Sequence, residues 1–327
     1  MTRTARRPSR DRATATFVPY SIDVVGARSV VRWIERPDTP SPTPSFARVT
    51  RALLAAGARQ RLTPIDALLA VEERDPAGLV LHQSRCGSTL LMQALAHAGC
   101  ISAVNEATPV NQLLLRTDIP EPERVLLLRG LLRALSAHDG AASDLPSVVK
   151  FTSWNVLFLD LIRAAMPETP WLFLYRDPLE VLASHQAKPV SWSDDDGFLG
   201  SLSTTGQLPP LHSLVRERRC AALLAAYGRA ALRAMPSASN LLNYDRLPVA
   251  LSSDVPARFG VVTSADQQRE IANASRIYSK DASRSVVFDA QAERRARPVS
   301  DAMREADKQF TRQVYESLER PRAVTFI

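Results

Sequence analysis

The chain has 327 residues, of which 45% are hydrophobic and 23% are charged, and it carries a formal net charge of +7. This mix is typical of a globular protein in water, with enough residues for one large domain or two small ones. It excludes a membrane span, because no apolar run approaches ~20 residues, and a secretory signal, because the arginine-bearing N-terminus lacks an apolar core.

Charge and cysteine usage limit the partners and the compartment. Residues 1–16 are predicted to form a disordered basic tail. The rest of the chain keeps a small positive excess that an anionic small molecule explains as well as nucleic acid does, and we expect no nucleic-acid partner. The widely spaced Cys86, Cys100 and Cys220 give neither a metal-ligand nor a disulfide pattern. A reducing cytoplasm is therefore the predicted location.

Residues 17–76 are predicted to form a mixed, partly helical extension that packs on a main domain spanning 77–327. The proline-rich segment Pro37–Pro44 disfavours helix and sheet and is interpreted as a linker. A helix is expected over Phe46–Ala58. Thr63–Pro64 has the pattern of a helix N-cap with proline at the first helical position, which predicts a second helix there.

The segment Gly78–His97 is predicted to be a buried strand, a polar turn and an apolar helix. The first N–H groups of a helix have no internal partner and carry partial positive charge, so an anionic oxygen is a favourable ligand there. Gly87 permits close approach of the backbone. The ATPase loop places a lysine directly after its second glycine to reach β/γ-phosphates. Here Ser88 follows Gly87 and the basic residue, Arg85, precedes it, which favours an anion without a triphosphate tail. The alternative is an ordinary strand-to-helix turn.

The remaining elements alternate between strands and helices. Further strands are expected at Ser147–Phe151, Trp171–Tyr175 and Leu241–Asp245. Such alternation predicts a mostly parallel sheet covered on both faces, which is a three-layer α/β/α fold. Ligands of these sheets bind at the carboxyl ends of the strands, where Arg85, Lys150 and Arg176 are expected.

Two later segments are polar. Residues 189–210 are predicted to be a mobile loop, because a segment of this length without secondary structure is usually a lid or disordered. The segment 276–298 is rich in basic residues, and most of its arginines are interpreted as a solvated surface. A final amphipathic helix is expected over Ser300–Leu318.

Three motifs together resemble the sulfotransferase family. They are SRCGSTLL at Ser84–Leu91, FLYRDPLEVLASH at Phe173–His185 and NYDRLP at Asn243–Pro248. The resemblance spans Gly78 to about Gly260. It implies a P-loop NTPase-like architecture and transfer of a sulfuryl group from 3′-phosphoadenosine 5′-phosphosulfate (PAPS) to a hydroxyl or amine, with no metal. The expected acceptor is a small molecule, a carbohydrate or a peptide.

The resemblance also implies which residues bind the donor. The first motif is similar to the family's 5′-phosphosulfate loop, and its candidate ligands are Ser84, Arg85, Cys86, Gly87, Ser88 and Thr89. Arg85 stands where the family commonly has lysine. The second is similar to the 3′-phosphate motif, in which Arg176 and Ser184 match in residue type and spacing. The alternative for Arg176 is an ion pair at the helix terminus with Asp177 or Glu180. Many family members close over the 3′-phosphate with a late basic loop, for which Lys280 and Arg284 are the candidates.

The catalytic residues are predicted less directly. Arg85 and Lys150 are expected to stabilise charge that develops during transfer. Family members use histidine or glutamate as the general base, and the strand end near Lys150–Trp154 has no histidine. Glu106 follows the first helix, as the glutamate does in some branches, and is the predicted base. A solvated loop residue is the alternative for Glu106, and His185 and then His82 are the next candidates.

Two other functions remain open from the sequence. One is a P-loop nucleotide kinase-like phosphotransferase, against which the missing lysine after Gly87 counts. The other is a non-catalytic domain that binds nucleotide with a degenerate loop.

Overall fold

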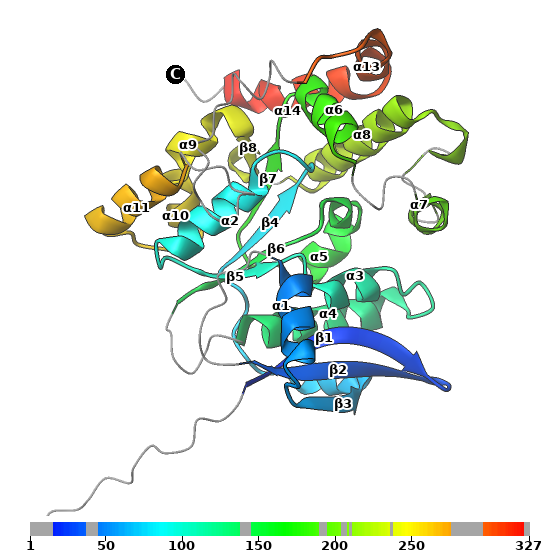
Figure 1. Ribbon diagram of the computed structural model, residues 1–327, viewed down its shortest axis with the longest axis vertical. Coiled ribbons are helices and arrows are strands. Elements are labelled where there is room, and N and C mark those ends of the chain that lie inside the picture. The colour runs from blue at the N-terminus through cyan, green and yellow to red at the C-terminus, as the bar shows by residue number, and fades with distance from the viewer. Residues whose placement is uncertain are drawn as a thin grey trace, which may run out of the picture.

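The computed structural model describes residues 16–36, 45–137, 145–189, 195–203, 208, 211–235, 238–275 and 297–323 (Figure 1). The predicted tail, apart from Thr16, lies outside the described residues, as do Lys280 and Arg284.

A five-stranded parallel sheet forms the centre of the molecule. Its strands are β4 (Gly78–His82), β5 (Ser102–Asn105), β6 (Ser147–Lys150), β7 (Trp171–Tyr175) and β8 (Leu241–Asn243). Their order across the sheet is β5-β6-β4-β7-β8. Leu79 of β4 pairs with Val149 on one side and Trp171 on the other. Every residue of β4 and β7 is buried, as expected for strands of a parallel sheet that is covered on both faces.

Alternate residues of β4 enter two separate hydrophobic cores, because successive side chains of a strand point to opposite faces. Val80 belongs to the core under α2, α9, α10 and α11, whereas Leu79 and Leu81 belong to the larger core under α3, α4, α5 and α8 (Figure 1). The first set is α2 (Ser88–His97), α9 (Leu247–Ala250), α10 (Asp254–Arg258) and α11 (Ala265–Ser275). The second set is α3 (Thr108–Leu114), α4 (Glu121–Ser136), α5 (Leu159–Ala165) and α8 (Arg216–Ala234). The predicted three-layer α/β/α fold is confirmed.

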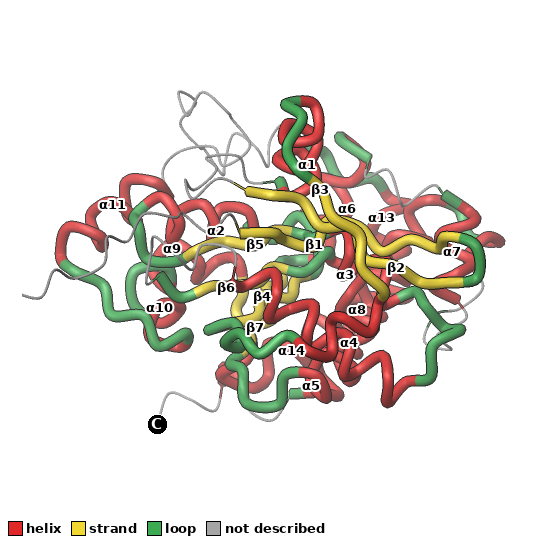
Figure 2. The backbone as a smooth tube through the Cα atoms, turned by 90° about the horizontal axis from the view of Figure 1, so that it is seen from below, coloured by secondary structure: helices red, strands yellow, loops and turns green. Residues whose placement is uncertain are grey.

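Residues before β4 form a second, antiparallel sheet of three strands. It contains β1 (Thr16–Val25), β2 (Arg28–Arg36) and β3 (Gln60–Pro64), and α1 (Phe46–Ala55) and the 3₁₀ helix η1 (Ile65–Ala70) accompany it. Figure 2 views the molecule from this end, with β1 and β2 crossing in front. The predicted helix start at Thr63 is wrong, because Thr63 lies in β3 and its hydroxyl accepts a hydrogen bond from the Trp33 indole at 2.8 Å.

The antiparallel sheet and the central sheet share one core. Ile22 and Trp33 lie in the same hydrophobic cluster as Leu79 and Leu127. A Cβ built on Gly130 of α4 would lie 1.9 Å from the Leu68 carbonyl oxygen of η1, so the two backbones touch and only glycine fits.

The remaining helices follow β6, β7 or β8 along the chain. They are the 3₁₀ helix η3 (Ser153–Phe158), α6 (Pro178–Ala187), α7 (Asp196–Ser203), α13 (Asp301–Ala306), the π-helical turn η8 (Asp307–Thr311) and α14 (Arg312–Ala323). Short 3₁₀ turns occur at η5 (Leu211–Ser213), η6 (Ala238–Asn240) and η7 (Tyr244–Arg246). Helix α7 lies inside the predicted loop, and its Leu199 and Leu202 are buried.

Candidate functional site

The strand order changes direction at β4. From β4 the chain passes to β5 and β6 on one side, and then to β7 and β8 on the other. Such a reversal leaves a gap between the connections that leave neighbouring strands, and ligands of open α/β sheets bind there. The predicted anion loop, residues 83–87, leaves β4 at this point.

The loop has an unusual backbone. Ser84 and Arg85 have φ angles of 73° and 51°, and Gly87, the N-cap of α2, has φ 85°. A Cβ on Gly87 would lie 2.6 Å from the Leu247 side chain and 2.8 Å from the Tyr244 ring. Glycine is therefore required both by the positive φ and by these close contacts. Among the described residues, the non-glycine residues with positive φ are Ser84, Arg85 and Glu106, and all three follow β4 or β5. Strained backbone of this kind concentrates at functional sites.

The buried His82 ring supports this loop. Its Nδ1 accepts a hydrogen bond from the Ser84 N–H at 3.1 Å, and its Nε2 lies 3.0 Å from the Phe151 carbonyl oxygen. Because an N–H can only donate and a carbonyl can only accept, Nε2 carries the proton. Burial lowers the pKa of His82, which keeps the ring neutral. Both ring nitrogens are thus engaged within the protein.

Lys150 and Glu106 form an ion pair beside the first turn of α2. Lys150 ends β6, is 4% exposed, and places its Nζ 2.7 Å from Glu106 Oε1 and 3.4 Å from Thr89 Oγ1. The Glu106 N–H donates to the Lys150 carbonyl at 2.7 Å, which fixes the left-handed residue against β6. His82 Nε2 is 3.8 Å from the same carboxylate oxygen.

The carboxylate of Glu106 is held ionised. Burial alone raises the pKa of Glu106, but the charge of Lys150 at 2.7 Å outweighs it, and the pKa lies well below its ordinary value. A carboxylate with so low a pKa is a weak proton acceptor as long as Lys150 stays beside it.

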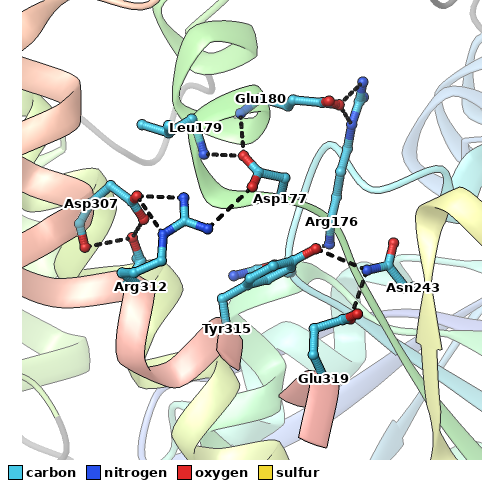
Figure 3. A network of polar contacts seen from close by, with 11 residues as sticks. Arg176, Asp177, Leu179, Glu180, Asn243, Asp307, Arg312, Tyr315 and Glu319 are labelled. Atoms are coloured by element: carbon cyan, nitrogen blue, oxygen red, sulfur yellow. Dashed lines mark hydrogen bonds and ion pairs between the residues drawn. The ribbon is translucent and has the colours of Figure 1, made fainter. Parts of the chain in front are cut away.

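Arg176 connects the ends of three strands. It follows β7, is 6% exposed, and donates from its NH1 to the Arg85 carbonyl at 3.4 Å. Its guanidinium carbon lies 4.3 Å from the centre of the Tyr244 ring, which follows β8. Its Nε and NH2 each lie 2.6 Å from Glu180 Oε2 (Figure 3). A helix-terminal ion pair of Arg176 is therefore present, together with a cation–π contact beside the anion loop.

The other loop residues have local partners. The Arg85 guanidinium donates to the Lys188 carbonyl, just after α6, at 2.5 Å. The buried Cys86 thiol donates to the Leu174 carbonyl at 3.3 Å, and burial raises the pKa of Cys86 to about 11. This thiol stays protonated at neutral pH, which is an inert form. Ser88 is buried at the start of α2.

Ser184 meets a residue that the sequence did not single out. This serine is buried on α6, and its hydroxyl accepts a hydrogen bond from Arg297 NH1 at 3.2 Å. Arg297 belongs to the basic segment interpreted as a solvated surface. Nothing in the local sequence distinguishes it from Arg294 and Arg295, so only the fold could single it out.

Two features are absent from the described ranges. No helix within them is apolar over a length that could cross a membrane. Within the same ranges, no three side chains from histidine, cysteine, aspartate and glutamate cluster as a metal site would require.

Comparisons with known proteins show a distant structural likeness. No protein-family model matches the sequence, and no curated protein matches it. Among solved structures, the chain is similar to a sulfotransferase domain from the curacin biosynthetic pathway, with 13% identity and a TM-score of 0.43 over 73% of this chain and 98% of that one.

Two further structures also match at low identity. The chain is similar to the mouse sulfotransferase SULT7A1 complexed with PAP, with 11% identity and a TM-score of 0.42 over 78% of this chain and 88% of that one. It is also similar to a retinol dehydratase in complex with androsterone and the inactive cofactor PAP, with 14% identity and a TM-score of 0.28 over 92% and 89% of the two chains.

Proposed function

We propose that the protein is a sulfotransferase that moves a sulfuryl group from PAPS to a hydroxyl or amine. The observation that supports the proposal is the placement of two groups of basic and hydroxyl side chains at neighbouring strand ends of one sheet. One group surrounds the loop after β4, and the other follows β7. PAPS has a phosphate on each side of its adenosine, so two such groups match it.

The 5′ side of the donor is assigned to the loop after β4. Its strained backbone and the left-handed Gly87 at the N-cap of α2 fit an anion held by N–H groups at the start of that helix. Lys150 adds a buried positive charge at 3.4 Å from the Thr89 hydroxyl. PAPS would supply the transferable sulfuryl group, and these residues would orient it and offset the charge on its oxygens.

The 3′ side is assigned to Arg176, Ser184 and Arg297. Arg176 is held beside the loop by the Arg85 carbonyl and the Tyr244 ring, and Arg297 already donates to the Ser184 hydroxyl. Guanidinium groups bind phosphate through charge-assisted hydrogen bonds. Lys280 and Arg284 remain candidates for the same phosphate.

Glu106 is assigned the role of general base, with a condition set by Lys150. The positive charge of Lys150 lowers the pKa of Glu106. An anion bound next to Lys150 opposes that effect and raises the pKa of Glu106 toward its ordinary value. The carboxylate then becomes a better proton acceptor for a hydroxyl or amine of a small molecule, carbohydrate or peptide.

The three cysteines are free and buried, which supports the reducing cytoplasm that we propose as the location.

Ligand binding tests the proposal against a kinase-like function. We expect adenosine 3′,5′-bisphosphate to raise the melting temperature, equally with and without a chelator, because a ligand that binds only the folded state stabilises it. ATP with magnesium is the comparison ligand. Stabilisation by ATP–magnesium alone, or loss of bisphosphate binding with chelator, contradicts the proposal. A turnover measurement with PAPS and a panel of hydroxylated and amine acceptors separates an enzyme from a non-catalytic binding domain.

A further inference from the structure

The carboxylate of Glu319 joins the carboxyl ends of β7 and β8. On α14, Glu319 Oε1 accepts hydrogen bonds from the Tyr175 hydroxyl at 2.6 Å and from the Asn243 side-chain amide at 2.8 Å. The Tyr175 hydroxyl also lies 3.2 Å from the Leu318 carbonyl oxygen. We call Glu319, Tyr175 and Asn243 the Glu319 clamp; Figure 3 shows its Asn243 contact.

Each strand residue of the clamp directly precedes a residue of the proposed 3′-phosphate site. Tyr175 precedes Arg176, and Asn243 precedes Tyr244, whose ring lies 4.3 Å from the Arg176 guanidinium carbon. Asn243 also accepts the Asp245 N–H at 2.9 Å through its other amide atom. Its amide is thereby oriented, with the nitrogen toward Glu319. The Glu319 clamp therefore holds the backbone next to Arg176 and next to Tyr244, the two residues of the cation–π pair.

Helix α14 also contacts the residue that follows Arg176. Arg312 NH1 lies 3.5 Å from Asp177 Oδ2, and Arg312 is itself held by the buried Asp307 at 2.6 Å (Figure 3). The other carboxylate oxygen of Asp177 caps α6 by accepting the Leu179 N–H at 2.9 Å. Both chain neighbours of Arg176 are thus tied to α14.

We propose that Glu319 is a positioning residue for the 3′-phosphate site, an assignment that rests on the proposed function. Glu319 acts through Tyr175 and Asn243, and Arg176 is the group that contacts the phosphate. Without the carboxylate, both strand ends lose a shared acceptor. The Arg176 side chain can then move with Glu180, its ion-pair partner at 2.6 Å, away from the Tyr244 ring.

Calorimetric titration of the full chain with two nucleotides tests this role. Adenosine 3′,5′-bisphosphate reports on the 3′ site, and adenosine 5′-monophosphate, which lacks the 3′-phosphate, reports on the rest. We expect Glu319→Ala to weaken the bisphosphate about tenfold and to leave the monophosphate within about twofold. Glu319→Gln keeps an acceptor oxygen and should restore most of the affinity. Glu316→Ala, at an exposed position of the same helix, is the control.

The decisive measurement is the same substitution in an Arg176→Ala background. If Glu319 acts through Arg176, Glu319→Ala has no further effect there. An added loss in that background, equal weakening of both nucleotides, or unchanged affinity in Glu319→Ala overturns the positioning role while the sulfotransferase proposal stands. A wild-type chain that does not bind the bisphosphate overturns both. If Glu319→Ala does not fold, Tyr175→Phe removes one hydroxyl, and the same selective weakening, about threefold, is expected.

Discussion

Glu106 and Lys150 are placed so that each controls the chemistry of the other. Their ion pair of 2.7 Å keeps the carboxylate charged and the ammonium close to Thr89. Under the proposed function, an anionic donor bound beside Lys150 would compete for its charge and raise the basicity of Glu106. Donor binding would then precede proton transfer from the acceptor.

Substitution of Glu106 tests this dependence. We expect Glu106→Gln to keep the affinity for adenosine 3′,5′-bisphosphate and to lower turnover by roughly 10²–10⁴-fold, because glutamine cannot take up the acceptor's proton. Initial rates with PAPS and a working acceptor provide the measurement. Glu123→Gln, at an exposed position of α4, is the control. Near-normal turnover in Glu106→Gln removes it from the mechanism and makes His185 the next residue to test.

His82 gives the fold a dependence on pH. Burial lowers the pKa of His82 in the folded protein, so the unfolded chain binds a proton more tightly at this residue than the folded chain does. Its contribution to stability is therefore complete above a pH of about 6.5 and is lost as the pH falls below that value. We expect the free energy of unfolding to fall between pH 7.5 and 5.5, and less steeply in His82→Gln. Denaturant titrations across this range measure the free energy of unfolding at each pH. An equal fall with pH in the wild type and in His82→Gln would exclude the effect.

At the scale of elements, the start of α2 shows how closely the loop is packed. Gly87→Ala forces a side chain into a left-handed conformation and against Leu247 and Tyr244. We expect a loss of stability of about 1–3 kcal/mol, together with weaker binding of adenosine 3′,5′-bisphosphate, measured by denaturation and calorimetry.

Gly99 provides a matched control just after the other end of α2. Its φ is +64°, and a Cβ there would have no atom within 4 Å. Gly99→Ala should therefore show the backbone penalty without the steric contact and leave nucleotide affinity unchanged. Equal effects of the two substitutions on affinity would mean that the close approach at Gly87 does not matter for the site.

The elements that the sequence predicts well are those whose hydrophobic pattern is dictated by burial on both faces. Continuous apolar runs identify β4 and β7, and the glycine before Ser88 identifies the start of α2. The edge strand β5 escapes detection because its buried Ser102 and Asn105 make it look like a polar connection. Arg297 escapes for a different reason, since its partner Ser184 is more than a hundred residues earlier.

At the scale of the whole molecule, the N-terminal sheet and the central sheet share one hydrophobic core. Ile22, Trp33 and Leu68 are buried in the same cluster as Leu127 and other residues of α4. Removing residues 1–76 would expose that side of α4 to water, at a cost of about 1.5–3 kcal/mol for each large side chain uncovered.

A pair of truncations tests this dependence. We expect residues 77–327 alone to lack a cooperative unfolding transition, and a chain without residues 1–15 to retain the melting temperature of the full protein. Circular dichroism during thermal unfolding measures both. A sharp transition at the full-length temperature in the 77–327 fragment would show that the main domain is independent of the N-terminal sheet.

The order of the central strands also bears on how the chain reaches this structure. Gly78 pairs with Val148 and Leu79 with Trp171. The partners of β4 therefore lie about 70 and about 90 residues later in the chain. Contacts of such long sequence separation slow folding, because loop closure must precede the gain from pairing. During synthesis, the apolar Leu79–Leu81 run stays unpaired until β6 and β7 emerge. The strand that precedes the proposed donor loop is therefore also a segment exposed to misassociation before folding is complete.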